Sequence, residues 1–270
     1  MKKILTLILL VIFSFGCGPR SDETTPEMAQ SLLKVRGFNF TEEEFFKAIK
    51  QADAPAVKLF LQSGINPNAR TKQGETAMTV AAAYSDVPTL KILTEKADIN
   101  EHDALGNTPL FVALKKPRDE IFDYLLEKGA DPNSDGTAKN AKNQSVLYVA
   151  VLRDKTDAVK KLLEKGADPN RTDDAGSLPI SEIILTYSPN MEAYKMILEK
   201  MTDVNKQEVG GSTLLIYASK NARLYPDVRR EIIKSLLEKG ADKRIKDKAG
   251  KTALDWAKER KITEAIELLK

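Results

Sequence analysis

The sequence predicts an all-α solenoid of about seven helix pairs joined by hairpin fingers. Three observations support this fold class. A short turn string recurs along the chain, a helix-opening motif follows it at a constant distance, and the segments between them carry apolar residues at helical spacing. A sequence period of about 33 residues is typical of stacked repeats, in which each unit contacts only its neighbours.

The turn string reads GADPN at residues 129–133 and 166–170, and related strings stand at 64–68 and 240–244. One weaker copy ends at Asn100 and another ends at Asn205. The last residues of successive copies are separated by 32, 33, 37, 35 and 39 residues. This near-constant spacing predicts units of one kind, with extra residues in the longer intervals.

The helix-opening motif begins eight residues after the turn marker in five units and twelve residues after it in the sixth. Its first residues are Thr76, Thr108, Ser145, Leu178, Thr213 and Thr252. A small residue follows five positions later in every unit except one, where Ile183 stands. Two motifs in constant phase are best explained by a true repeat.

This pattern resembles the ankyrin repeat, whose T-P-L-H-x-A signature is closest to Thr108-Pro109-Leu110 here. The resemblance covers residues 41–270. It implies paired helices, with fingers and first helices lining a concave surface that binds proteins. The signature histidine is replaced in every unit, which predicts looser coupling between fingers. The replacing residues are Thr79, Phe111, Tyr148, Ser181, Ile216 and Asp255.

Glycine and proline predict where the second helices end and begin. The glycines at 64, 129, 166 and 240 should end these helices in the left-handed conformation. Lys96 and Met201 occupy that place in two units, where a left-handed non-glycine residue would cost about 1–2 kcal/mol. We therefore expect two weaker junctions. Pro55, Pro189 and Pro226 should each open a second helix, because proline suits the first turn.

The N-terminal residues 1–16 are typical of a secretory signal peptide: two lysines precede an apolar stretch that is too short to span a membrane. Cys17, the only cysteine, follows at once. The string Phe15-Gly16-Cys17 resembles the lipobox of bacterial lipoproteins. That resemblance implies a lipid on Cys17 and, with Gly18 next, the periplasmic side of the outer membrane. Residues 17–40 are expected to form a lipidated tether with a lead-in helix.

Composition excludes several classes of protein. One cysteine and one histidine cannot form a disulfide within the chain or an all-Cys/His zinc site. Loss of Lys2 and Lys3 with the signal would leave 40 basic against 39 acidic residues, and aromatics make up only 6% of the chain, so no nucleic-acid partner is expected. Residues 131–136 begin like a calcium loop, but Lys142 stands where its glutamate is required. We predict no catalytic residue and no cofactor.

Candidate partner-binding residues come from two patterns. Residues seven and eight positions after the opening threonine should face outward from the first helix. Residues 134–143 should lengthen one finger, and residues 219–228 should lengthen the loop between two paired helices. The positive charge among them predicts an acidic partner surface, although an ordinary solvated face and tolerated loop variation are alternatives. The candidates are Arg70, Lys72, Tyr84, His102, Leu105, Lys115, Lys116, Lys139, Lys142, Leu152, Arg153, Thr186, Tyr187, Lys220, Asn221 and Arg223.

We therefore expect a non-catalytic protein-binding module that faces the bacterial envelope. The favoured hypothesis is an inhibitor or immunity protein that binds a secreted or periplasmic enzyme such as a cell-wall hydrolase. A scaffold or accessory factor that localises an envelope protein is the alternative. An enzyme with an unfamiliar site is a third class. A released effector is a fourth, which lipid attachment at Cys17 would disfavour.

Overall fold

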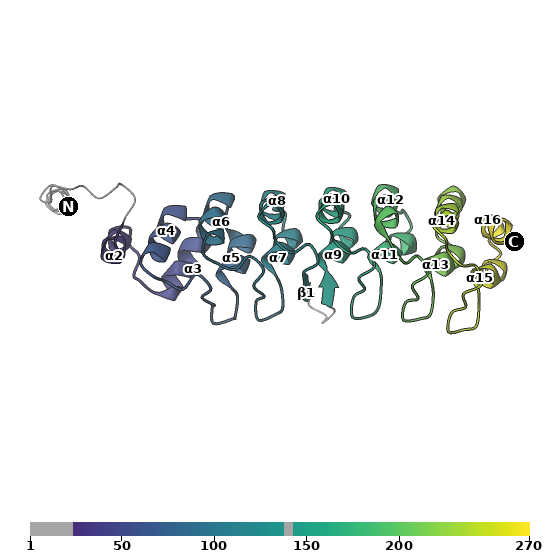
Figure 1. The fold of residues 1–270 in the computed structure, drawn as a ribbon, viewed down its shortest axis with the longest axis horizontal. Coiled ribbons are helices and arrows are strands. Elements are labelled where there is room, and N and C mark those ends of the chain that lie inside the picture. The colour runs from purple at the N-terminus through teal and green to yellow at the C-terminus, as the bar shows by residue number, and fades with distance from the viewer. Residues whose placement is uncertain (1–23, 138–142) are drawn as a thin grey trace, which may run out of the picture.

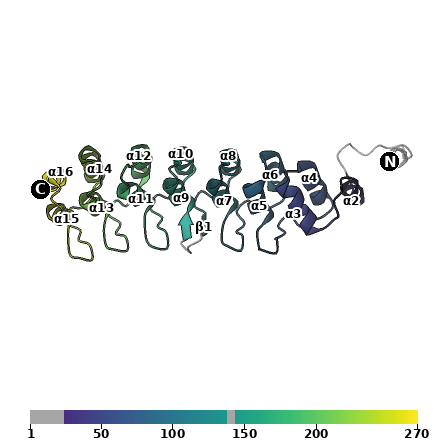
Figure 2. The ribbon, with the colours of Figure 1, turned by 180° about the vertical axis from the view of Figure 1, so that it is seen from behind.

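The helices of this chain stand side by side in one elongated row (Figure 1). The computed structural model describes residues 24–137 and 143–270. Within these residues there are fifteen helices and one two-stranded sheet. Helix α2 lies at one end of the row and α16 at the other, and the view from behind shows the same order (Figure 2).

Each unit contributes one helix to each of two layers. The first helices are α3 (Glu42–Lys50), α5 (Ala77–Tyr84), α7 (Pro109–Lys115), α9 (Val146–Leu152), α11 (Pro179–Leu185), α13 (Leu214–Lys220) and α15 (Ala253–Glu259). The second helices are α4 (Ala54–Gln62), α6 (Val87–Thr94), α8 (Asp119–Glu127), α10 (Thr156–Glu164), α12 (Met191–Lys200), α14 (Pro226–Glu238) and α16 (Thr263–Leu269). The two helices of each unit contact each other in all seven predicted pairs, and neighbouring first helices contact each other along the whole row.

The core runs continuously between the two layers. Its largest fully buried side chains include Phe45, Phe60, Phe111 and Tyr194. Each such side chain contributes about 1.5–3 kcal/mol by leaving water. The Tyr194 hydroxyl also lies 2.8 Å from Ser235 Oγ in the next unit, so the one polar group of this ring has a partner. Packing within and between units therefore forms one continuous core.

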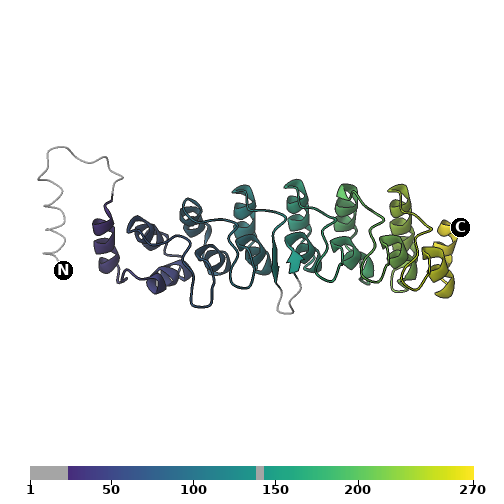
Figure 3. The same cartoon turned by 60° about the horizontal axis from the view of Figure 1, so that its bottom comes forward.

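Fingers project from the first-helix layer, all toward the same side of the row (Figures 1 and 3). In most units the finger is a tight loop, closed in the first case by an antiparallel bridge between Arg70 and Thr76. One finger instead contains the antiparallel strands β1 (Asp135–Thr137) and β2 (Asn143–Ser145). The finger that is longer in sequence thus contains a two-stranded sheet, with one strand before residues 138–142 and the other after them.

Side-chain caps explain why the opening motif starts a helix. The Thr76 hydroxyl accepts a hydrogen bond of 3.1 Å from the Thr79 amide, and its own amide donates to Thr79 Oγ1, which completes a capping box. The hydroxyls of Thr108, Ser145, Thr213 and Thr252 likewise accept a hydrogen bond from the amide three residues on, and Thr252 also completes a capping box. These bonds satisfy amides that lack a partner within the helix.

The predicted glycine ends are confirmed, because Gly64, Gly129, Gly166 and Gly240 all have φ between 87° and 96°. The prediction of strain at Lys96 and Met201 is wrong, since neither has a positive φ. Met201 is extended (φ −64°, ψ 138°), so the chain leaves α12 by a different turn. Left-handed non-glycine residues occur elsewhere, at Ala52, Asp154 and Lys261 in the loops between paired helices.

Two of the three proline predictions are confirmed. Pro55 lies in the first turn of α4, and α14 begins at Pro226. Pro189, however, lies before the cap of α12. The Asn190 carboxamide accepts a 3.0 Å hydrogen bond from the Ala193 amide, so this helix begins at Met191. A strong cap residue after the proline moves the start of the helix.

Helix α2 (Pro26–Val35) extends the row beyond the first pair and packs on α4. Ala29 and Leu33 on its inward face are fully buried. Arg36, just after the helix, forms an ion pair of 2.7 Å with Asp53, the cap of α4. This ion pair holds the Asp53 side chain in place. Burial alone would raise the pKa of Asp53, but its hydrogen bonds with Arg36 and the Ala56 amide outweigh that effect and lower the pKa.

An asparagine ladder links the turn of each unit to the turn of the next. The Asn carboxamide oxygen accepts a backbone hydrogen bond from the following turn. The five bonds are Asn68 to Asp98 (3.0 Å), Asn100 to Asp131 (2.9 Å), Asn133 to Asp168 (2.7 Å), Asn170 to Asp203 (3.2 Å) and Asn205 to Asp242 (2.8 Å). Arg244 takes the equivalent place in the last turn and bonds Asp242 of its own turn. The turn string is therefore an inter-unit connection.

Asn133→Ala should lower the free energy of unfolding by about 1–3 kcal/mol, because it removes the bond to Asp168 and a 3.1 Å bond from its amide to the Gly166 carbonyl. Urea denaturation followed by circular dichroism measures the change. Arg244→Ala, at the same place in its unit, is the control and should change stability by less than about 0.5 kcal/mol. Equal losses in the two variants would show that the ladder does not stabilise the row.

Candidate functional site

The predicted helix-face residues lie where the first helices end. Tyr84, Lys115, Leu152 and Lys220 are the last residues of α5, α7, α9 and α13. We call the surface formed by these helix ends and the fingers the inner face. Cations at the C-terminal end of a helix interact favourably with the helix dipole, which suits the lysines found there.

A cluster of lysines surrounds Tyr84 near the N-terminal end of the inner face. The Nζ atoms of Lys50 and Lys116 lie 5.6 Å and 5.5 Å from the centroid of the Tyr84 ring, which is 47% exposed. Lys115 Nζ lies 5.0 Å from the Phe111 ring. Neither Lys50 nor Lys116 forms an ion pair with a described residue. The cluster therefore carries positive charge that an acidic ligand could meet.

A second cluster of cations surrounds Trp256 near the C-terminal end. Lys251 Nζ, Lys220 Nζ and Arg260 Cζ lie 4.3, 5.5 and 5.8 Å from its indole ring. The indole nitrogen donates a 2.6 Å hydrogen bond to Asp247. Burial, with a smaller contribution from the charge of Arg260, lowers the pKa of Lys220. This cluster places a tryptophan ring beside three cations, and tryptophan and arginine are residue types that are enriched at protein-binding sites.

Sequence reasoning missed Lys50 and Trp256. Trp256 lies four residues after its opening threonine, a position that we did not assign to the inner face. The same position in the preceding unit holds Tyr217, whose hydroxyl donates to the buried Glu208 at 3.2 Å. Burial raises the pKa of Glu208. The signal available in the sequence was the single tryptophan, since that residue type is enriched where proteins bind each other.

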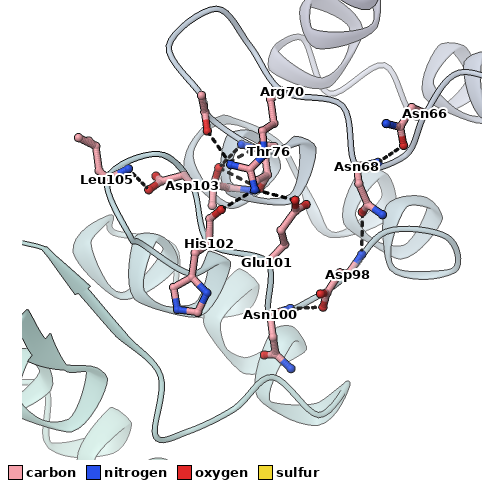
Figure 4. A network of polar contacts seen from close by, with 12 residues as sticks. Asn66, Asn68, Arg70, Thr76, Asp98, Asn100, Glu101, His102, Asp103 and Leu105 are labelled. Atoms are coloured by element: carbon pink, nitrogen blue, oxygen red, sulfur yellow. Dashed lines mark hydrogen bonds and ion pairs between the residues drawn. The ribbon is translucent and has the colours of Figure 1, made fainter.

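Arg70 connects two neighbouring fingers (Figure 4). Its guanidinium forms a 2.7 Å ion pair with Glu101 and a 2.9 Å hydrogen bond with the His102 carbonyl. The Ala104 amide also donates to the Gly74 carbonyl of the preceding finger at 3.0 Å. The expectation of loosely coupled fingers is therefore wrong for this pair, because other groups make the connection.

The remaining finger candidates reach solvent. The side chains of Lys72, His102 and Leu105 are exposed, and the Leu105 amide donates to the Asp103 carboxylate at 2.9 Å (Figure 4). Leu105 is 68% exposed, the largest value among the large hydrophobic side chains of the described residues. Cys17, Lys139 and Lys142 lie outside the described residues.

The middle of the inner face is apolar. Leu152 and Leu185 end neighbouring first helices and are half exposed. Tyr187, in the loop after α11, meets Tyr225 from the loop before α14: their ring centroids are 5.3 Å apart in an edge-to-face arrangement, and their hydroxyls are 3.0 Å apart. Thr186, also exposed, donates its hydroxyl to the Ile183 carbonyl at 2.8 Å.

The lengthened loop before α14 is held by buried groups. Arg229, which is 3% exposed, donates 2.8 Å hydrogen bonds to the carbonyls of Asn221 and Leu224 and also pairs with Glu264. The side-chain carboxamide of Asn221 donates to the Ile184 carbonyl of the neighbouring unit at 2.8 Å. Asn221 thus positions the loop, whereas Arg223 in the same loop is exposed.

The extra residues of this unit divide between the loop and the helix. Residues 221–225 connect the pair, and α14 has 13 residues against nine in α4, α8 and α10. The prediction that residues 219–228 all belong to a longer loop is therefore wrong, because residues 219–220 end α13 and residues 226–228 begin α14. The helical pattern of Arg229, Ile232, Ile233 and Leu236, all buried, accounts for the longer helix.

Two chemical possibilities can be addressed from the described residues. No three of their histidine, cysteine, aspartate or glutamate side chains lie together as metal ligands would. In the same part of the chain, no helix has the length and apolar character needed to cross a membrane.

Arg229→Met should lower the free energy of unfolding by about 3–5 kcal/mol, because it leaves Glu264 and two loop carbonyls without their partner. Thermal or urea denaturation measures this loss. Adding Glu264→Gln should restore part of the stability, because the unpaired carboxylate is then gone. If the single variant is as stable as the wild type, Arg229 does not hold the loop.

Comparisons with known proteins agree with this geometry. The family model "Ankyrin repeats (3 copies)" matches residues 45–136, and the model "Ankyrin repeat" matches residues 142–174. The ankyrin repeat-containing protein P1E11.10 of Schizosaccharomyces pombe is 38% identical over 37% of this chain and 46% of its own length. The ANK repeat-containing protein nipk-1 of Caenorhabditis elegans is 31% identical over 43% and 22%. The chain thus spans less than half of either relative.

A solved structure extends the likeness over most of the chain. The ankyrin repeat domain of Bcl-3 superposes with a TM-score of 0.63 at 24% identity, over 83% of this chain and 97% of the domain. At this identity the likeness concerns the fold. The repeats recognised in the sequence and the seven stacked pairs agree with it. The fold of this chain is therefore an ankyrin-repeat fold, of the kind that serves as a protein-interaction module.

Proposed function

We propose that this chain is a non-catalytic inhibitor or immunity protein of the bacterial envelope, which binds a secreted or periplasmic enzyme through the inner face. The observation that carries the proposal is the composition of that face. Cation–aromatic clusters around Tyr84 and Trp256 stand at its two ends, and half-exposed leucines and tyrosines stand between them. Aromatic side chains and arginine are enriched at the centres of protein interfaces, and lysines favour association with acidic surfaces.

The envelope location rests on the N-terminal sequence. An apolar stretch in residues 1–16 followed by Cys17 supports export and lipid attachment. Several acyl chains would hold the protein on the periplasmic face of the outer membrane, since one chain alone binds only marginally. A protein placed there would meet enzymes that act on the cell wall before they reach their substrate. Stoichiometric occlusion of such an enzyme needs no catalytic residue.

Lys116→Glu with Arg153→Glu should reduce capture of the partner at least tenfold, because it reverses charge on the inner face. The tagged full chain is purified from detergent-solubilised envelopes, and the captured proteins are quantified by mass spectrometry. Lys91→Glu with Lys160→Glu, exposed on the second-helix layer, makes the same charge change and should leave capture intact. Equal capture by both double variants would remove the inner face from the proposal.

Inhibition is tested on the captured protein. Its enzymatic activity should fall to background at one equivalent of the purified chain, since the proposed mechanism is occlusion. Full activity in the saturated complex would contradict inhibition and support a scaffold that localises the enzyme.

The lipid is tested separately. Cells fed an alkyne-tagged fatty acid should label the wild-type protein, and Cys17→Ser should abolish the label, because no other cysteine is present. Gel fluorescence after coupling a dye to the alkyne measures it. Absence of label on the wild type, or label that survives in Cys17→Ser, would overturn the anchor.

A further inference from the structure

Helix α2 carries an exposed apolar stripe at the N-terminal end of the row. Met28, Leu32 and Val35 follow one another at intervals of four and three residues, so they lie on one side of the helix. Their side chains are 48%, 39% and 66% exposed. Ala29 and Leu33, which are fully buried, lie on a different side. The packing of α2 on α4 therefore leaves the stripe open to another surface.

The charged residues of α2 do not interrupt this stripe. Glu27 and Lys34 are exposed, and at about 100° per residue they project from a third side of the helix. With ten residues, α2 is too short to cross a bilayer, which takes about 20. An apolar side next to a charged side is the pattern of helices that lie in the surface of a membrane.

The chain before α2 limits what can cover the stripe. Nine residue steps separate Cys17 from Pro26, the first residue of α2. A chain spans at most about 3.3–3.6 Å per residue, so Pro26 lies within about 32 Å of Cys17. Neighbouring helices pack about 8–10 Å apart, which places α16, seven pairs further along, roughly 55–70 Å from α2 (Figure 1). A lipid on Cys17 would therefore hold the α2 end of the row next to the membrane.

The small size of the stripe favours a surface to which the chain is already tethered. Three partly exposed side chains offer much less than the ~800 Å² that each partner buries in a stable protein interface. A tether makes the second contact intramolecular, with an effective concentration in the millimolar range for a short linker. A weak apolar contact can then persist. The bilayer that would hold Cys17 meets this condition.

We propose that Met28, Leu32 and Val35 rest on the lipid surface to which Cys17 is attached, so that α2 orients the row at the membrane. The stripe enters the boundary between headgroups and acyl chains, and Glu27 and Lys34 stay in water. The inference rests on the lipid anchor of the proposed function and is independent of inhibition. It adds a second, non-covalent contact with the membrane.

The test places an environment-sensitive dye on the stripe. The full lipidated chain with Leu32→Cys is labelled with a nitrobenzoxadiazole maleimide and reconstituted into phosphatidylethanolamine–phosphatidylglycerol vesicles. With lipid on the Cys17 sulfur, the introduced thiol is the only one that reacts. We expect the emission to shift to shorter wavelength and nitroxide-labelled lipids to quench it roughly twofold or more, because such a helix lies within the membrane boundary. Val209→Cys, on an exposed finger, is the matched control and should show neither effect.

A further variant separates the stripe from the dye. Adding Met28→Glu and Val35→Glu to the labelled Leu32→Cys chain should remove both the shift and the quenching, because a carboxylate is costly among acyl chains. Circular dichroism verifies that this variant folds. Quenching that persists in it would show that the dye makes the contact by itself, and would overturn the proposal.

The remaining outcomes distinguish the anchor from the stripe. Two dyes on each Leu32→Cys chain would show that the Cys17 thiol is free, which overturns the lipid anchor and the inference with it. One dye per chain with equal quenching at positions 32 and 209 would leave the anchor intact and overturn the contact of α2 with the membrane. A shift that grows with protein density and ignores the nitroxide lipids would assign the stripe to a second copy of the chain.

Discussion

The structure depends on the stacking of each unit on the next. A helix pair of this size cannot bury both of its apolar faces by itself, so the core exists only as a continuous layer between neighbours. The Asn carboxamide of one turn and the backbone of the next provide the directional part of this contact, at separations of 2.7–3.2 Å. Hydrophobic packing holds the units together, and the ladder adds a hydrogen bond between the turns of adjacent units.

Because packing and the asparagine ladder hold the units together, the inner face remains available for binding. Backbone groups form hydrogen bonds within the helices, with the threonine caps and with the ladder. The side chains at the ends of the first helices are therefore little needed for the hydrogen bonding that stabilises the fold. These positions consequently hold very different groups in successive units, from Lys50 and Tyr84 to Leu152 and Lys220. A regular scaffold thus supports an irregular surface, with cation–aromatic clusters at both ends and half-exposed leucines and tyrosines between them.

Two arginines show how charge can serve the scaffold instead. Arg70 is exposed in part, but its guanidinium is used between fingers. Arg229 is buried, and its hydrogen bonds fix a loop that would otherwise be free to move. Burying a guanidinium has a substantial desolvation cost, which its partners must offset. The two terminal nitrogens of Arg229 bind two loop carbonyls and Glu264, whereas its buried Nε has no partner among the described residues, and these bonds hold the lengthened loop that carries Tyr225.

Local rules were sufficient for the repeat and its fold. The turn string, the capping threonines and the glycine at the helix end each act within a few residues, so their spacing alone predicted seven pairs in the right register. The same locality limited the prediction at Met201 and Pro189, where the chain had a second way to end or begin a helix: an extended exit at Met201 and the Asn190 cap. Lys96 also avoids the left-handed conformation.

The sequence by itself determined the repeat, the layer to which each helix belongs and most of the residues at the first-helix ends, Lys50 excepted. Only the tertiary structure decided which of those residues meet, since Tyr187 and Tyr225 are 38 positions apart in the chain and Lys50 reaches Tyr84 from a different unit. Repeat spacing specifies where a side chain is attached. Its contacts depend on how neighbouring units are rotated against each other, and that rotation is set by packing across the whole row.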